Sequence, residues 1–255
     1  MYCIKHIQSS LKPAKLSAFQ EHISNGRTSE RNRLSSLFSM ISSISMKSFP
    51  MKNFLAIALF SAMILSATEN IALPKPAIPQ EATLAAALAN RQSHREFGGG
   101  ELTPQQLSNL LWAAYGQNRA DGKLTVPAAL NRHAFDLYVL TAKGVTLYDQ
   151  KANALIPVCD KDLRVMAEGR KTLGPAAAAV ILLVAKTDIF GANGDFYLGV
   201  EAGAICQDIY LYAATAKLNA LCCGSLDAAG LTKALSLPAN QKPVLTMVVG
   251  PAPEK

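Results

Sequence analysis

The sequence predicts an α+β fold in which helices pack against a mixed sheet. Two strand patterns separated by a short turn, 135–141 and 145–148, predict a hairpin. Two continuous apolar runs, 177–185 and 244–249, fit strands that are buried on both faces. A long helical pattern at 196–217 lies between these runs. Because helices and strands do not alternate regularly, a sandwich with a mixed sheet is favoured over a doubly wound parallel sheet.

The elements before the hairpin are a lead-in, two helices and a loop. Residues 71–79 contain three prolines and are expected to be extended. Residues 81–91 are rich in alanine and leucine, which predicts a helix. A second helix is predicted at 103–115, where a threonine N-cap and a proline precede an apolar face. Residues 116–130 are polar and predict a loop.

The elements after the hairpin include the long helical pattern. Residues 160–170 fit a helix, 219–223 a short strand, and 227–235 a helix that is capped by Asp227. The helix at 196–217 is apolar on nearly every side. A helix without a polar face is buried, so we expect it either at the centre of the domain or in a subunit interface.

The basic character of the chain is concentrated at its N-terminus. The formal net charge of the 255 residues is +7. Residues 1–68 hold eight Lys and Arg against two acids, whereas 69–255 hold 17 against 16 and are nearly neutral. A nearly neutral domain has no broad positive field to hold a nucleic-acid backbone. Any anion that this domain binds must therefore be held by a few local charges.

Residues 51–68 have the pattern of a secretory signal peptide. Lys52 precedes an apolar run at 54–65, and small residues follow it. The run is shorter than the roughly 20 residues that span a bilayer, so no stable membrane anchor is expected. The alternative is a buried helix of the globular domain. If the signal is used, the protein is exported or periplasmic; otherwise it is cytoplasmic.

The first 50 residues are rich in serine and show no apolar period, which predicts disorder. Because a signal peptide begins a chain, the extension is interpreted as an artefact of start choice, with Met51 or Met46 as the start. An organelle transit segment is the alternative. The expected organisation is an extension at 1–50, a signal peptide at 51–68, a lead-in at 69–80 and a folded domain at 81–255.

The cysteines and glycines do not form a familiar metal or nucleotide site. The cysteines are Cys3, Cys159, Cys206, Cys222 and Cys223, without a CxxC or Cys/His cluster, so no metal is expected. The adjacent Cys222 and Cys223 are interpreted as small buried hydrophobes, with a redox pair as the alternative. No GxSxG, P-loop or GxGxxG motif is present, which argues against a serine hydrolase and a Rossmann domain.

A candidate anion site stands at the end of the first predicted helix. It comprises Arg91, Gln92, Ser93, His94 and Arg95. Arginine presents planar donors that match the geometry of a phosphate. Taken alone, this cluster fits a solvated basic face better than a binding site. The stretches that follow it along the chain change that interpretation.

These stretches occur in a fixed order. They are Glu96-Phe97 directly after the cluster, LLWAAYGQNR at 110–119, PAALN at 127–131, the long helix around 201–211, CCGSLD at 222–227 and VVGPAP at 248–253. Their order and spacing resemble the nitroreductase family over about residues 81–253. The stretch at 110–119 resembles the SagB-type and short nitroreductase-like branch of that family.

The resemblance implies a three-layer sandwich with a mixed, mostly antiparallel sheet, a long central helix and a homodimer that binds FMN at the subunit interface. It implies an oxidoreductase that passes hydride or electrons from a reductant such as NAD(P)H to nitroaromatic, quinone or related acceptors in a ping-pong mechanism. No catalytic side chain is expected, because the flavin carries the chemistry. Two alternatives stay open: a flavin-binding protein with little turnover, and a SagB-like dehydrogenase of azoline rings in modified peptides.

The resemblance also assigns three groups of FMN contacts. The phosphate and ribityl group comprises Arg91, Ser93 and Arg95, with Gln92 near the ring. The group that reaches the flavin from the other subunit comprises Pro127, Ala128, Ala129 and Asn131. The group that lies near N5 comprises the backbone amides of Cys223, Gly224 and Ser225. Fixed amide donors at that position stabilise the electron density that reduction adds to the ring.

Two features depart from the family pattern. Ala128 stands where the family usually has a serine, so one hydroxyl contact is missing. The sequence ends at Lys255, whereas many relatives continue with a basic tail that reaches the phosphate or the partner subunit. Both departures bear on catalytic competence more than on the fold.

Overall fold

The computed structural model describes residues 69–167, 173, 176–191 and 193–254. They belong to one compact unit that spans Thr68–Lys255. The expected extension at 1–50 and the expected signal peptide at 51–68 lie outside the described residues. In the part of the chain that the structure describes, no helix combines the length and apolarity needed to cross a bilayer.

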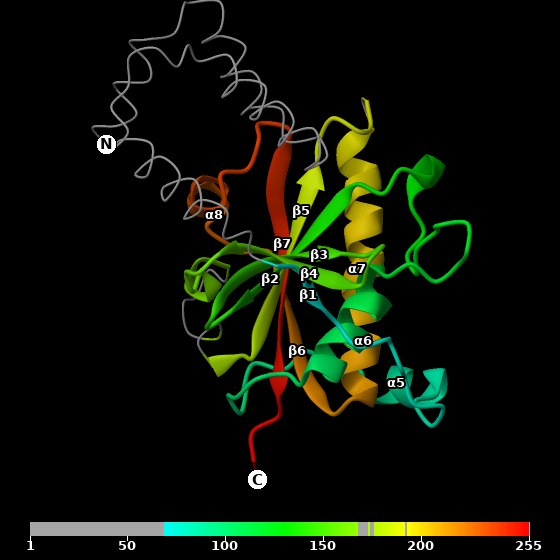
Figure 1. Cartoon of the computed structure of the whole chain (residues 1–255). Coiled ribbons are helices and arrows are strands. Elements are labelled where there is room, and N and C mark those ends of the chain that lie inside the picture. The colour runs from blue at the N-terminus through cyan, green and yellow to red at the C-terminus, as the bar shows by residue number, and fades with distance from the viewer. Residues whose placement is uncertain (1–68, 168–172, 174–175, 192, 255) are drawn as a thin grey trace, which may run out of the picture. The chain divides into compact units, whose positions relative to one another are not determined.

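A seven-stranded antiparallel sheet forms the middle layer of the unit (Figure 1). The strands are β1 Ile71–Ala72, β2 Phe135–Thr141, β3 Gly144–Asp149, β4 Ala154–Cys159, β5 Ala179–Lys186, β6 Leu218–Cys223 and β7 Gln241–Pro251. Their order is β1-β4-β3-β2-β5-β7-β6, and each neighbouring pair is antiparallel. The predicted hairpin is confirmed as β2 and β3. The order also places β6 at one edge of the sheet.

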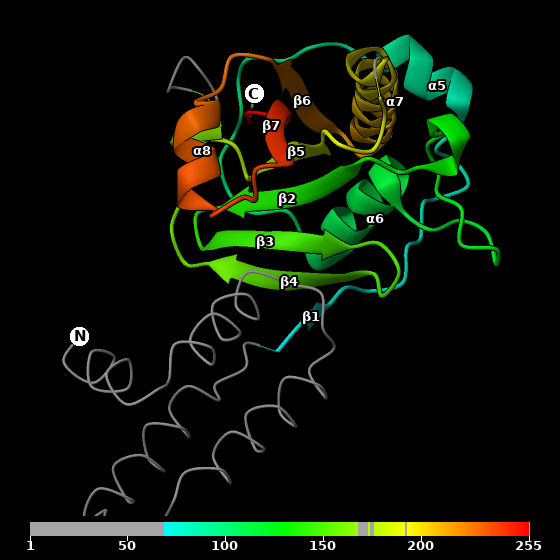
Figure 2. The ribbon, with the colours of Figure 1, turned by 90° about the horizontal axis from the view of Figure 1, so that it is seen from above.

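Helices cover both faces of this sheet. They are α5 Leu84–Asn90, α6 Pro104–Tyr115, α7 Gly194–Thr215 and α8 Ala228–Ala234. Figures 1 and 2 show α5, α6 and α7 on one side of the strands and α8 on the other. Both α5 and α6 contact α7, which makes α7 the central helix of its layer. The predicted α+β sandwich with three layers and a long helix is therefore confirmed. The prediction of a mixed sheet is wrong for the described strands, because every neighbouring pair is antiparallel.

Strand β5 explains why one continuous apolar run supports two cores. Its side chains alternate between the two faces of the sheet, as in any strand. Ile181 and Leu183 are fully buried in the core beneath α6 and α7. Val180 and Leu182 are equally buried on the other face, in the core that includes Leu231 of α8. The prediction of a strand buried on both faces is confirmed.

The start of α6 is confirmed by its local hydrogen bonds. The Thr103 hydroxyl accepts from the backbone N–H of Gln106 at 3.1 Å, and the Gln106 side chain accepts from the backbone N–H of Thr103 at 2.9 Å. This reciprocal pair is a capping box, which satisfies two donors that a helix start leaves unpaired. Pro104 follows at the first helical position, where it needs no hydrogen bond.

The predicted helix at 160–170 is wrong in its described part. Only a single 3-10 turn forms, at Arg164–Ala167, and residues 168–170 lie outside the described part of the chain. The Asp162 carboxylate accepts from the Arg164 guanidinium at 2.7 Å, and that guanidinium also donates to the Ala177 carbonyl at 2.6 Å. These contacts hold a turn against the sheet instead of a helix.

The strand β4, which precedes this turn, was not predicted, because a short run that contains Pro157 is a weak strand pattern.

The helix α7 is not buried on every side within one chain. Leu198, Ile205 and Ile209 face the core and are at most 8% exposed. On the opposite side, Phe196 is 68% exposed and Val200 is 55% exposed. The expectation of an all-round buried helix at the domain centre therefore fails for the single chain. The alternative expectation, an apolar face available to a second subunit, stays a prediction.

Candidate functional site

The predicted anion motif lies along the edge strand β6. Arg91 caps the C-terminus of α5, and the chain then runs beside β6. The backbone N–H of His94 donates to the Ala220 carbonyl at 2.9 Å, and the Asn219 side chain donates to the Glu96 carbonyl at 2.7 Å. The backbone N–H of Gly98 then bonds to a carbonyl of β7. These contacts fix the motif against the sheet, so its side chains project from an ordered backbone.

Tyr210 of α7 joins the motif to β6. Its hydroxyl lies 2.9 Å from the Ser93 hydroxyl and accepts the backbone N–H of Cys222 at 2.8 Å. The guanidinium carbon of Arg91 lies 5.3 Å from the centre of the Tyr210 ring, within cation–π range. Tyr210 was not predicted as a site residue. Its only signal in the sequence was its place in the long-helix stretch of the resemblance.

The charges at this motif are available to a ligand. Of the ion pairs among the described residues, none involves Arg91 or Arg95. Arg91 is half-buried on the Tyr210 ring, whereas Gln92, Ser93 and Arg95 are exposed. A partly desolvated guanidinium beside a hydroxyl favours an anionic group that carries several oxygens.

The backbone amides that the resemblance places near N5 lie at the end of β6, in the segment 223–225, which we call the amide turn. Cys223 is the last residue of the strand, and Gly224 and Ser225 are exposed beyond it. A β-carbon added at Gly224 would meet only the Leu245 side chain, at 3.7 Å. The space in front of this backbone is therefore open, as a planar ligand resting on it would require. The edge strand thus connects the anion motif to an accessible turn.

The loop that carries Pro127, Ala128, Ala129 and Asn131 lies at the other end of α7. Figure 1 shows this loop before β2 beside the upper end of α7, and α5 beside the lower end. Its contact with α7 is at Glu201, nine residues before Tyr210, which is about 14 Å along the helix axis. One chain therefore does not bring this loop to the motif at Arg91. Ala128 is half-buried and supplies no hydroxyl.

Buried Glu201 fixes the end of this loop. Its carboxylate accepts the Tyr115 hydroxyl at 2.6 Å and the backbone N–H of Ala134 at 3.2 Å. The Tyr115 oxygen in turn accepts the backbone N–H of Phe135 at 3.2 Å. Burial raises the pKa of Glu201, although its hydrogen bonds with Tyr115 and Ala134 act to lower it. Burial also raises the pKa of Tyr115. Sequence reasoning missed this cluster, because a single glutamate in an apolar helix shows no partner.

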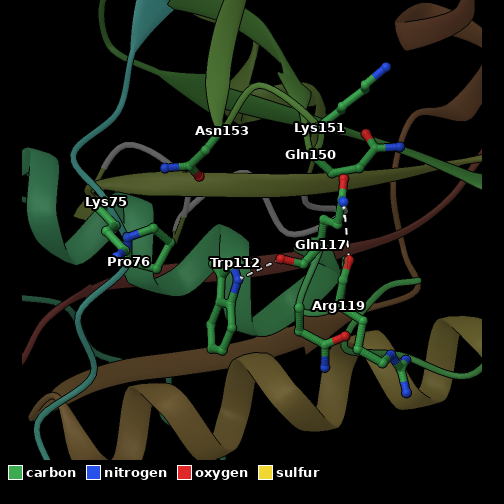
Figure 3. A pocket seen from close by; sticks show the side chains of 9 residues that line it. Lys75, Pro76, Trp112, Gln117, Arg119, Gln150, Lys151 and Asn153 are labelled. Atoms are coloured by element: carbon green, nitrogen blue, oxygen red, sulfur yellow. Dashed lines mark hydrogen bonds between the residues drawn. The ribbon is translucent and has the colours of Figure 1, made fainter. Parts of the chain in front are cut away.

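A shallow depression lies apart from the predicted FMN contacts (Figure 3). It encloses about 430 Å³ and is lined by Lys75, Pro76, Trp112, Gln117, Asn118, Arg119, Gln150, Lys151 and Asn153. Several of its polar groups serve the fold, since the Trp112 ring N–H donates to the Gln117 carbonyl at 3.1 Å. None of the residues predicted to hold FMN lines it. We therefore place the candidate site at the motif and not in this depression.

The described residues offer no cluster of three or more metal ligands. Lys255, the last residue of the sequence, lies outside the described part of the chain. The assignments of the three groups of FMN contacts stay predictions. The groups at 91–95 and 223–225 share the edge strand β6, whereas the group at 127–131 lies at the far end of α7.

Comparisons with known proteins agree with this architecture. The model of the nitroreductase family matches residues 88–251. A protein of Methanocaldococcus jannaschii assigned to the nitroreductases is 27% identical over 184 residues, which cover 67% of this chain and 92% of the relative. A crystal structure of a protein of Ralstonia eutropha, also assigned to the nitroreductases, is 30% identical with a TM-score of 0.67, covering 74% of this chain and 92% of that one.

A more distant structure adds support for the fold alone. It is that of a protein of Desulfovibrio desulfuricans, described as a nitroreductase in complex with FMN. It is 20% identical, has a TM-score of 0.52, and covers 67% of this chain and 87% of that one. The family match spans well over half of the sequence and includes the motif, the central helix and the closing strand. The chain therefore belongs to the nitroreductase family, and it is an oxidoreductase of that family by its fold and its sequence.

Proposed function

We propose that this protein is an FMN-dependent oxidoreductase that moves electrons from a reductant such as NAD(P)H to nitroaromatic, quinone or related acceptors. The observation that supports it best is the arrangement along β6. There the Arg91 guanidinium, without a described ion pair, rests on Tyr210 beside the Ser93 hydroxyl. The same strand leads into the open turn at Gly224.

In this proposal each described group has a separate task. Arg91, Ser93 and Arg95 hold the phosphate and the ribityl chain, because they supply cationic and hydroxyl donors. The backbone amides at 223–225 would hold the ring, where their N–H groups would stabilise the negative charge that reduction adds. FMN, when bound, supplies hydride exchange at its ring, which protein side chains do not provide. The relative described in complex with FMN, which shares the fold, is consistent with this cofactor.

The proposed order of events uses the open space at Gly224. Reductant and acceptor would use the same space above Gly224 one after the other, which is a ping-pong scheme. The residues of this chain would bind and orient both molecules at that position. None of them needs to donate or accept a proton for the proposed transfer.

We also propose that the working unit is a homodimer. Phe196 and Val200 are exposed on α7, and Leu130 is 77% exposed in the loop before β2. Exposed apolar groups of this size on neighbouring elements favour association. A second copy would carry its own residues 127–131 to the motif at Arg91, which one chain alone does not do.

The cofactor proposal predicts a yellow protein. Full-length chain incubated with FMN and freed of excess cofactor is expected to show the flavin absorption bands, and NAD(P)H is expected to bleach them without oxygen. A nitroaromatic or quinone should then restore the colour. Protein that stays colourless after incubation with FMN would contradict the proposal. Binding without bleaching would instead favour a flavin-binding protein with little turnover, as the missing hydroxyl at Ala128 allows.

The dimer proposal predicts that Val200→Glu weakens association at least about tenfold, since a symmetric interface would bury the new charge in both copies. Analytical ultracentrifugation of the wild type and the variant measures the dissociation constant. Val158→Glu is the matched control, because Val158 is 39% exposed on β4. In the sheet, four strands separate β4 from β6, which contacts α7. A wild type that sediments as a monomer at all concentrations, or equal weakening by both variants, would contradict the interface.

A further inference from the structure

Two cysteine sulfurs lie in contact beside the proposed cofactor site. Cys206 belongs to α7 and Cys222 to β6, and their sulfur atoms are 3.8 Å apart. Cys206 is 6% exposed, whereas Cys222 is half-buried. The expected alternative of a redox pair between the adjacent Cys222 and Cys223 does not fit the structure. Neighbouring strand residues point to opposite faces, and these two pack in different cores.

The Cys206 and Cys222 thiols have the chemistry that disulfide exchange requires. A disulfide bond is about 2.05 Å long, so the two sulfurs need to approach each other by about 2 Å. The hydrogen bond with Cys206 lowers the pKa of the Cys222 thiol, although burial opposes this change. The hydrogen bond with Cys222 and burial both raise the pKa of Cys206. Cys222 is the more accessible partner, and its lowered pKa favours the thiolate form that attacks a disulfide.

We propose that Cys206 and Cys222 form a reversible dithiol–disulfide site that links α7 to β6. The oxidant is a low-molecular-weight disulfide. The Cys222 thiolate attacks one sulfur of that disulfide and releases one thiolate, which leaves a mixed disulfide on Cys222. The Cys206 thiol then loses its proton and attacks the Cys222 sulfur, which releases the second thiol. Two protein thiols are oxidised to one disulfide, and one small disulfide is reduced to two thiols.

The two cysteines are connected to the proposed cofactor contacts through Tyr210 and through the backbone of β6. The backbone N–H of Cys222 donates to the Tyr210 hydroxyl, which also contacts Ser93. Cys206 precedes Tyr210 by four residues, which is one turn of α7. Cys222 also precedes the turn at 223–225. A bond between the two sulfurs therefore acts on the backbone of both FMN-contact groups along β6. This consequence rests on the proposed function, whereas the disulfide itself does not.

Peptide mapping tests the disulfide directly. The full chain is reduced, freed of reductant and incubated with oxidised glutathione as the probe, and remaining thiols are alkylated before trypsin digestion. Cys206 falls in peptide 187–217 and Cys222 in peptide 218–233, so the bond joins two peptides with the loss of two hydrogen masses. We expect this linked pair as the main oxidised product, and expect reductant to separate it. Fragmentation of the linked pair distinguishes Cys222 from Cys223.

Two variants keep the test decisive. Cys206→Ser is expected to stop at the glutathione mixed disulfide on Cys222, and Cys222→Ser is expected to form neither product at Cys206. Cys159→Ser is the control, because Cys159 ends β4 in another part of the sheet, and the linked pair should form in it unchanged. Circular dichroism confirms that each variant is folded. If the folded wild type yields no 187–217 to 218–233 linkage, or if Cys206→Ser still closes a disulfide at Cys222, the site is refuted.

A second readout separates this proposal from the proposed function. FMN affinity, measured by quenching of flavin fluorescence, is expected to differ at least about fivefold between the reduced and the crosslinked wild type. The same treatment should leave the affinity of the folded Cys222→Ser variant nearly unchanged, because that variant is expected to form neither the mixed disulfide nor the crosslink. Linked peptides from a protein that binds no FMN would support the disulfide and refute the cofactor. Linked peptides with equal FMN affinity in both states would refute only the coupling.

Discussion

Replacing Glu201 by leucine is expected to lower the free energy of unfolding by about 3 kcal/mol. Glu201 is 1% exposed, and its carboxylate accepts the Tyr115 hydroxyl and the backbone N–H of Ala134. Leucine fills a similar volume but offers no acceptor, so two buried donors would lose their partner. Each loss costs about 1–3 kcal/mol, and removal of the buried charge offsets part of it. Urea unfolding followed by circular dichroism measures the change.

Glu201→Gln is the matched control for this prediction. Glutamine keeps one acceptor oxygen, so we expect a loss of about 1 kcal/mol or less. The Tyr115→Phe variant, alone and combined with Glu201→Leu, completes a double-mutant cycle between the two side chains. Because the hydrogen bond joins a hydroxyl to a carboxylate at 2.6 Å, the cycle should give a coupling of about 1.5–3 kcal/mol. A Leu variant as stable as the wild type would contradict the structural interpretation of this cluster.

The glutamine variant also predicts a pH dependence with a definite sign. Burial raises the pKa of Glu201, so the folded protein holds this proton at pH values where the unfolded chain has released it. The resulting stabilisation is fully present below the ordinary carboxyl pKa and is lost as the pH rises through the raised value. The wild type should therefore lose stability relative to Glu201→Gln as the pH increases over this window. A difference that stays constant with pH, in urea titrations of both proteins, would argue against a raised pKa.

Replacing Arg91 by alanine is expected to weaken FMN binding between about 10- and 100-fold. A hydrogen bond to a charged group contributes about 1.5–3 kcal/mol, and about 1.4 kcal/mol corresponds to a factor of ten. Arg91 is already held on the Tyr210 ring, so little side-chain entropy is lost when it binds an anion. Arg91→Lys keeps the charge but not the planar fork, so its affinity should fall between the other two. Titration with FMN, followed by fluorescence quenching, measures all three proteins.

Riboflavin provides the decisive control for Arg91, because it lacks the phosphate. If Arg91 holds the phosphate, the alanine variant should bind riboflavin nearly as well as the wild type does. Lys151→Ala removes the same charge from the depression in Figure 3 and should leave FMN affinity nearly unchanged. Equal losses of affinity for FMN and riboflavin would mean that Arg91 contacts the ring or stabilises the fold and does not hold the phosphate. A loss of the same size in Lys151→Ala would indicate a general effect of net charge.

Much of the secondary structure could be predicted from the sequence, because local patterns report local energies. The start of α6 follows from Thr103 and Pro104, whose capping interactions span three residues. The burial of β5 follows from an unbroken apolar run. The motif at Arg91 was also visible, since its chemistry lies within five consecutive residues. Strand β4 was missed, because its pairing with β3 outweighs a weak local preference that includes Pro157.

The sequence by itself determined most of the segments that become helices and strands, and it showed a cluster of basic and hydroxyl side chains at 91–95. Only the tertiary structure decided which distant groups meet. Tyr115 and Glu201 are 86 residues apart along the chain, and Cys206 and Cys222 are 16 apart, yet each pair is in contact. Such contacts depend on how α6, α7 and β6 pack on the sheet. That packing is fixed by burial over the whole domain, and a window of neighbouring residues does not encode it.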